Sequence, residues 1–155
     1  MAQRADERPS PVVVGVDGSA CSQAAPRWGL AQAELTGSTV EAVAAWQSPE
    51  VYAYTLGWSP LVPEGTEFAK IAERALQETV AAVRDQLDHP AEVTIRVDEG
   101  HPVQVLMDAA RTAQLLVLGS RGHGTFTGIL LGSVSQHCVQ HAPCPVVVIP
   151  QPRPA

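Results

Sequence analysis

The strongest constraint on the fold is a set of short aliphatic runs that end in turn residues. The first run, Val12 to Val14 with Val16, stops at Asp17-Gly18, and the run 115–119 ends at Gly119. Continuous aliphatic runs of this length are typical of parallel strands buried on both faces of a sheet. We predict five strands, at about 12–16, 39–46, 93–97, 115–119 and 145–150.

Apolar residues at helical spacing separate these strands. In the first such segment Ser22 is placed to cap a helix that ends at Gly37. The expected buried face of this helix comprises Ala24, Trp28, Ala31 and Leu35. A second helix, beginning near Thr66, has helical spacing at Phe68, Ile71, Ala75, Val80, Val83 and Leu87. Two further helices are expected, at about 102–110 and 133–141, and the proline-containing segment 47–65 is expected to be a long loop.

The order of these segments is strand, helix, strand, and so on through five strands. Such alternation predicts an α/β fold in which a doubly wound, five-stranded, mostly parallel sheet carries helices on both faces, in a Rossmann-like arrangement. A chain of 155 residues is the usual size of one domain. We therefore predict a single domain over 11–150, with tails at 1–10 and 151–155.

The composition narrows the choice of partners. The formal net charge is −6, which argues against a nucleic-acid duplex or an anionic membrane as partner, while leaving room for a small phosphate ligand. Three cysteines make no disulfide framework. The polar first residues do not resemble a signal peptide, and no apolar run approaches the roughly 18 residues of a membrane span. A cytoplasmic location is the expectation.

The segment 119–132 contains five glycines, which lower stability unless the backbone needs them. A phosphate-binding P-loop is excluded because no glycine precedes a lysine. A dinucleotide fingerprint is disfavoured because Gly122, Gly124 and Gly128 follow the fourth strand instead of the first. Two interpretations stay open. Either the segment is a glycine-rich mobile loop, or Gly132-Ser133 begins a helix whose unpaired N–H groups bind phosphate.

The spacing Gly119-x2-Gly122-x9-Gly132-Ser133 resembles the motif of the nucleotide-binding universal stress proteins. The resemblance includes VVVGVDGS near the start and LLGSVSQHCVQHAPCPVVVIP at the end, so it covers nearly the whole chain. It implies a fold like that of the adenine nucleotide α-hydrolases, ATP as the usual ligand, and a homodimer formed through the terminal strand 145–150. Gln114 departs from the aspartate common before the fourth strand, which should affect the preceding helix end more than the ligand.

The resemblance also implies ligand contacts at particular positions. Around the adenine it places Gly15, Val16, Asp17 and Ala45. Near the ribose it places Leu118 and Gly119. Around the phosphates it places Arg121, Gly122, Gly132, Ser133, Val134 and Ser135, with hydroxyls of the two serines adding hydrogen bonds.

Asp17 is the acidic residue that strand logic places beside this site. Its carboxylate could accept a hydrogen bond from the adenine amino group or hold Mg²⁺ or Mn²⁺ between phosphates. Asp before Gly is also a common turn former, which is the alternative explanation.

Other reactive residues give weaker patterns. His137 and His141 could share a helix face near Cys144, but a fourth zinc ligand is missing at the usual spacing, so a helix running into a strand explains HCVQHAPC better. His123 could contact phosphate or face solvent, and Cys21 is more simply a packing residue. No triad or carboxylate pair is evident.

Three functions follow from these patterns. The leading hypothesis is an ATP-binding universal stress protein that senses nucleotide and has at most slow hydrolysis. The second is a metal-dependent ATPase or phosphotransferase that uses Asp17. The third is an interaction module that binds AMP, a cyclic nucleotide or no nucleotide.

Overall fold

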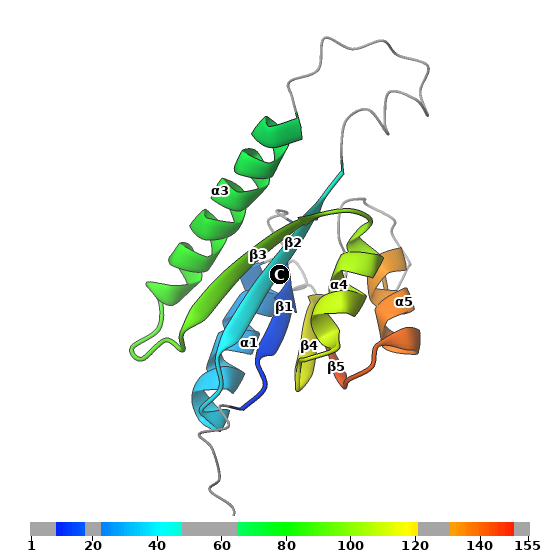
Figure 1. The fold of residues 1–155 in the computed structure, drawn as a ribbon. Helices are drawn as coiled ribbons and strands as arrows, with labels where there is room; N and C mark the ends of the chain where they lie inside the picture. Colours follow the sequence, from blue (N-terminus) through cyan, green and yellow to red (C-terminus); the bar gives the residue numbers. More distant parts are fainter. Residues whose placement is uncertain (1–8, 18–22, 48–64, 121–130, 151–155) are drawn as a thin grey trace, which may run out of the picture.

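One parallel five-stranded sheet organises the protein (Figure 1). The computed structural model describes residues 9–17, 23–47, 65–120 and 131–150. The strands are β1 (Val12–Gly15), β2 (Val40–Trp46), β3 (Val93–Glu99), β4 (Leu115–Gly119) and β5 (Val146–Ile149). Their order is β3-β2-β1-β4-β5, and all four pairings are parallel. The predicted fold class is therefore confirmed, with a sheet that is parallel throughout the described strands.

The helices are α1 (Ala24–Thr36), α3 (Gly65–Arg84), α4 (Pro102–Ala110) and α5 (Ser133–His141). They form two layers, with α1 and α3 on one face of the sheet and α4 and α5 on the other (Figure 1). Side chains of β1 alternate between the layers: Val12 and Val14 join the core under α1 and α3, while Val13 joins the core under α4. All three valines are fully buried, as expected for the central strand of such a sheet.

The buried face of α1 differs from the predicted one. Leu35 was expected in the core but is 82% exposed, and the buried positions include Ala25, Gly29, Leu30 and Ala33 instead. The reason is close packing: a Cβ added to Gly29 would lie 2.5 Å from Cγ2 of Val14. Small residues spaced four apart let the α1 backbone approach β1, so the helix turns this face toward the sheet, together with Leu30, and leaves Leu35 outside the core.

Two smaller expectations about the helices also need correction. The N-cap of α1 falls on Gln23, which makes no side-chain cap hydrogen bond, and Ser22 lies outside the described residues. In α3, Ile71 is 63% exposed, whereas Leu76, Val80 and Val83 are buried.

Gln114 does not act at a helix end. Its amide Nε2 donates to the carbonyl of Ser10 and to the hydroxyl of the buried Ser38, which ties together the segments that lead into β1, β2 and β4. The side chain therefore aligns the beginnings of three neighbouring strands, at the end of the sheet where those strands start.

Candidate functional site

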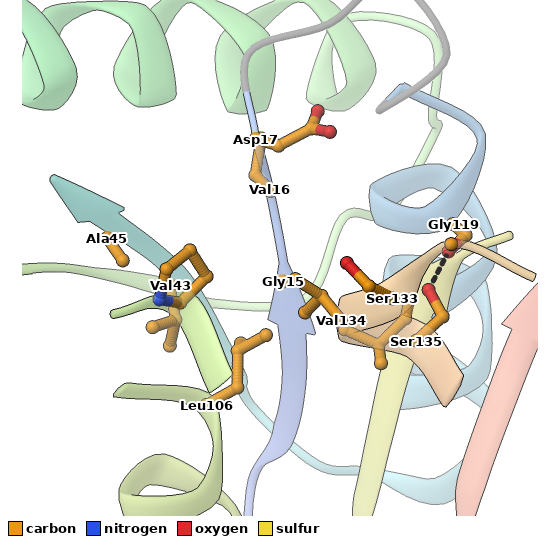
Figure 2. Close-up of a pocket in the computed structure, with 13 residues that line it drawn as sticks. Gly15, Val16, Asp17, Val43, Ala45, Leu106, Gly119, Ser133, Val134 and Ser135 are labelled. Carbon is orange, nitrogen blue, oxygen red and sulfur yellow. Dashed lines mark hydrogen bonds between the residues drawn. The ribbon is translucent and has the colours of Figure 1, made fainter. Parts of the chain in front are cut away.

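A pocket of about 290 Å³ opens where the sheet changes its direction of winding. It lies beyond the carboxyl ends of β1, β2 and β4, between the first turns of α4 and α5 (Figure 2). In open parallel sheets, ligands bind at this position because the loops on either side diverge and leave a crevice. The lining residues are Gly15, Val16, Asp17, Val43, Ala45, Pro102, Leu106, Leu118, Gly119, Gly132, Ser133, Val134 and Ser135.

The floor of the pocket depends on Gly15, the last residue of β1. A Cβ built there would lie 2.7 Å from Cδ2 of Leu118 and 3.0 Å from Cδ2 of Leu106. The missing side chain therefore leaves room for two leucines beneath the pocket. Beyond Gly15, the amide of Val16 donates to the carbonyl of Val43 at 2.9 Å, which continues the β1–β2 ladder up to the exposed Asp17.

The first turn of α5 forms another side of the pocket. Gly132 is its N-cap, in an extended conformation, with its carbonyl accepting from the amide of Gln136 at 2.9 Å. The amide of Gly132 donates to the carbonyl of Ser120 at 2.7 Å, so the helix start is fastened to the end of β4. First-turn amides have no partner within a helix and carry partial positive charge, which suits an anion. The chemistry of this side of the pocket therefore suits an anionic group.

Ser135 has a role that sequence reasoning missed. Its hydroxyl donates to the carbonyl of Gly119 at 2.7 Å, and the residue is only 5% exposed (Figure 2). The predicted hydrogen bond from this hydroxyl to phosphate is thus replaced by a bond that joins α5 to β4. Ser133, in contrast, is exposed at the pocket.

Removing the hydroxyl of Ser135 tests whether its hydrogen bond to Gly119 stabilises the protein. Ser135→Ala should lower the free energy of unfolding by about 1–2 kcal/mol, because the carbonyl of Gly119 loses its donor in a buried place. Ser135→Thr keeps the hydroxyl and should restore most of the loss. Equilibrium denaturation in urea measures both variants, and equal stability of Ser135→Ala and wild type would contradict the assignment.

Every predicted site residue that the structure describes lines this pocket. They are Gly15, Val16, Asp17, Ala45, Leu118, Gly119, Gly132, Ser133, Val134 and Ser135. Arg121 and Gly122 lie outside the described residues, as do His123 and Cys21.

The sequence analysis missed three lining residues: Val43, Pro102 and Leu106. Two signals could have found them. Val43 precedes Ala45 by two residues on β2, so both side chains face the same side of the sheet. Pro102 and Leu106 are four residues apart on α4, so they share one face of that helix.

The remaining reactive side chains do not form a metal or nucleophile site within the described ranges. No group of three or more His, Cys, Asp or Glu side chains is close enough there to hold a metal. The rings of His137 and His141 contact each other with centroids 4.6 Å apart. Cys138 is fully buried, and burial raises the pKa of its thiol to about 11, so it is not a thiolate nucleophile near neutral pH.

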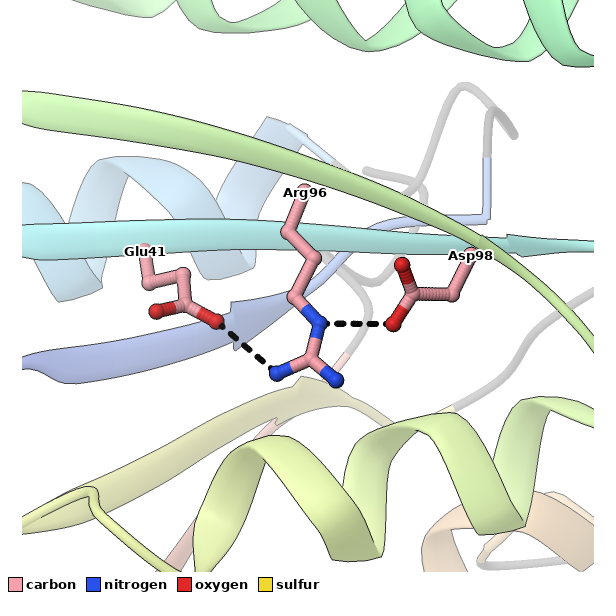
Figure 3. A network of polar contacts seen from close by, with 3 residues as sticks. All are labelled: Glu41, Arg96 and Asp98. Carbon is pink, nitrogen blue, oxygen red and sulfur yellow. Dashed lines mark hydrogen bonds and ion pairs between the residues drawn. The ribbon is translucent and has the colours of Figure 1, made fainter.

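A charged network lies on the neighbouring strands β2 and β3 (Figure 3). Arg96 of β3 donates from Nε to Asp98 at 2.6 Å, and its Nη1 lies 3.5 Å from Oε1 of Glu41 on β2. Arg96 pairs in register with Val43, and Asp98 pairs with Ala45. The hydrogen bond that Arg96 donates to Asp98, together with the charges of Asp98 and Glu41, raises the pKa of Arg96. The Arg96 guanidinium therefore stays positively charged across the physiological pH range.

An open parallel sheet of this order, with a pocket at the switch in winding, defines a doubly wound α/β protein. The chain belongs to the universal stress protein family, because the sequence model described as "Universal stress protein family" matches residues 10–150.

Among the helices that the structure describes, none has both the length and the apolar character that a membrane span requires.

Individual relatives support this assignment. Universal stress protein Rv1996 of Mycobacterium tuberculosis is 34% identical over 163 residues, an alignment that covers 93% of this chain and 49% of that protein. The chain thus spans about half the length of the curated relatives that it matches.

Solved structures share the fold. A universal stress protein in complex with cAMP has a TM-score of 0.61 at 24% identity, covering 92% of this chain and 98% of that one. A universal stress protein from Archaeoglobus fulgidus in complex with dAMP has a TM-score of 0.61 at 23% identity, covering 90% and 96%.

Proposed function

We propose that this protein binds an adenine nucleotide in the pocket, with ATP as the expected ligand, and acts as a nucleotide-responsive regulator in a stress response. The observation that carries the proposal is convergence. Residues from the ends of β1, β2 and β4 and from the first turn of α5 are far apart in the sequence but line one pocket. The family motif relates the same residues to a nucleotide.

The two sides of the pocket suit the two ends of a nucleotide. Val43, Ala45, Pro102 and Leu106 form an apolar side that suits the flat face of a base. The first turn of α5, with the exposed Ser133, forms a polar side that suits phosphate. Relatives with this fold are described in complex with cAMP and with dAMP, both adenine nucleotides.

Asp17 is exposed on the pocket lining between these two sides. Mg²⁺ is commonly held by one or two carboxylates together with substrate phosphates, so a single aspartate fits a metal that arrives with the nucleotide. We propose Asp17 as the protein ligand of Mg²⁺ or Mn²⁺. Its carboxylate would also reduce affinity for a metal-free triphosphate by charge repulsion.

The proposal extends to the assembly. Residues 11–150 act as one domain, in the cytoplasm, and two copies pair through β5. This strand ends the sheet order, and its four aliphatic residues are only partly buried within one chain. An uncovered aliphatic edge favours pairing with another strand.

Direct measurement of the ligand tests the function. Denaturing the purified protein should release an adenine nucleotide, which mass spectrometry identifies by its mass. Calorimetric titration of ligand-free protein with ATP, AMP and cAMP, each with and without Mg²⁺, should then show the tightest binding for Mg²⁺-ATP. If AMP or cAMP binds more tightly than Mg²⁺-ATP, that nucleotide is the ligand in place of ATP. If none of the three binds, the proposed function is wrong.

A further inference from the structure

The apolar side of the pocket comes from β2 and α4, and of its residues the family resemblance includes Ala45 alone. Val43 and Ala45 project from β2, and Leu106 projects from α4 (Figure 2). Pro102, four residues before Leu106 on α4, also lines the pocket. None of these four side chains can donate or accept a hydrogen bond. This side of the pocket can therefore distinguish ligands by size and shape, and not by hydrogen bonds from side chains.

Leu106 is held in place from several directions. It is 6% exposed and belongs to the buried cluster that contains Val13, Val43 and Leu118. Its Cδ2 and Cδ1 atoms lie 3.0 Å and 3.4 Å from the position that a Cβ of Gly15 would occupy. The side chain fills the space left by that glycine. Because close-packed side chains cannot move away freely, the end of Leu106 limits how deep a ligand can enter.

We propose that Leu106 is a specificity-determining residue, which sets the depth of the base-binding end of the pocket and favours a flat bicyclic base by contact with its face. The inference rests on the proposed function, because it assigns one end of the nucleotide to α4. It adds that selection of the base and binding of the phosphates are separate tasks, performed by α4 and α5 on opposite sides of the pocket.

Separate tasks predict separable effects on binding. Shortening Leu106 should weaken binding of ATP, whose base loses contact area, but leave binding of inorganic tripolyphosphate nearly unchanged, since that ion has no base. CTP, with a smaller ring, should be affected less than ATP. The preference for ATP over tripolyphosphate therefore reports on contacts with the base, and its change in the Leu106 variants reports on Leu106.

The experiment measures the affinities of Mg²⁺-bound ATP, CTP and tripolyphosphate by calorimetry for wild type, Leu106→Ala and Leu106→Val. Val105→Ala is the matched control, because Val105 is 5% exposed on the same helix but does not line the pocket. Leu106→Ala should weaken ATP about tenfold, equal to about 1.4 kcal/mol, and leave tripolyphosphate within about twofold. Leu106→Val should change ATP binding less, in the same direction, and decides the matter if Leu106→Ala does not fold.

The possible outcomes separate this inference from the proposed function. If the Leu106 variants and Val105→Ala change the ATP-to-tripolyphosphate preference equally, Leu106 does not select the base, although the protein still binds nucleotide. If wild type binds neither ATP nor tripolyphosphate, both proposals are wrong. A preference that falls in the Leu106 variants and stays constant in Val105→Ala supports the assignment.

Discussion

Gly132→Val should weaken binding of ATP and of tripolyphosphate by at least about 100-fold. Gly132 has φ −68° and ψ 164°, an extended conformation that valine adopts easily, so the backbone does not require glycine here. If the phosphates bind as we propose, this position needs free space beside the first amides of α5, where Gly132 lines the pocket. The branched side chain of valine would occupy the proposed place of the phosphate. The affinities for ATP and for tripolyphosphate should therefore fall by similar factors, because both ligands bind through phosphates. Calorimetric titration measures it.

A substitution on the same helix provides the control. Gln136 is exposed on α5 and does not line the pocket, so Gln136→Val should leave both affinities within about twofold of wild type. Circular dichroism of each variant establishes that the helices are retained. Full ATP binding by a folded Gly132→Val would mean that the phosphates lie elsewhere, and the site assignment would be abandoned.

Leu30→Ala should be strongly destabilising, and Leu35→Ala should have almost no effect. Leu30 is 1% exposed in the core beneath α1 and α3, whereas Leu35 is 82% exposed near the end of the same helix. Truncating a buried leucine costs about 2–5 kcal/mol, because apolar contact is lost and a cavity forms. An exposed leucine loses little, and alanine favours the helix, so the change should be within about 0.5 kcal/mol. Urea denaturation measures the free energy of unfolding of both variants.

These two leucines are matched in type and lie five residues apart on one helix. Because both changes are leucine to alanine, a difference between them shows which face of α1 is buried. Equal losses in the two variants, or a larger loss at Leu35, would show that α1 packs with the face that its hydrophobic spacing predicts.

The fold was largely predictable because the strands are local features. Runs such as Val12–Val14 are apolar on both faces, so they can be placed only in the centre of a sheet with helices on both sides. The order of the segments then leaves few topologies for short, right-handed connections. The rotation of α1 was not predictable, because it depends on Gly29 contacting Val14, a residue of another element.

The candidate site shows the same division. Strand ends and glycine spacing led to Asp17, Gly132 and Ser133, and the family resemblance added Gly15; the structure places all four around one pocket. The contribution of α4 was missed because Leu106 reads as an ordinary core leucine in the sequence. The role that we propose for Leu106 at the pocket depends on its packing against the backbone of Gly15, where a side chain is missing. No local sequence pattern predicts a contact between residues about ninety positions apart.

The printed chain, read alone, is enough to identify the alternating strands and helices and the glycine spacing typical of the family, since both are properties of residues near one another in sequence. Packing in three dimensions decides which face of α1 is buried, where the hydroxyl of Ser135 is directed, and that Leu106 forms the apolar end of the pocket. Such features depend on distances between segments remote in sequence, and those distances exist only after the sheet has assembled.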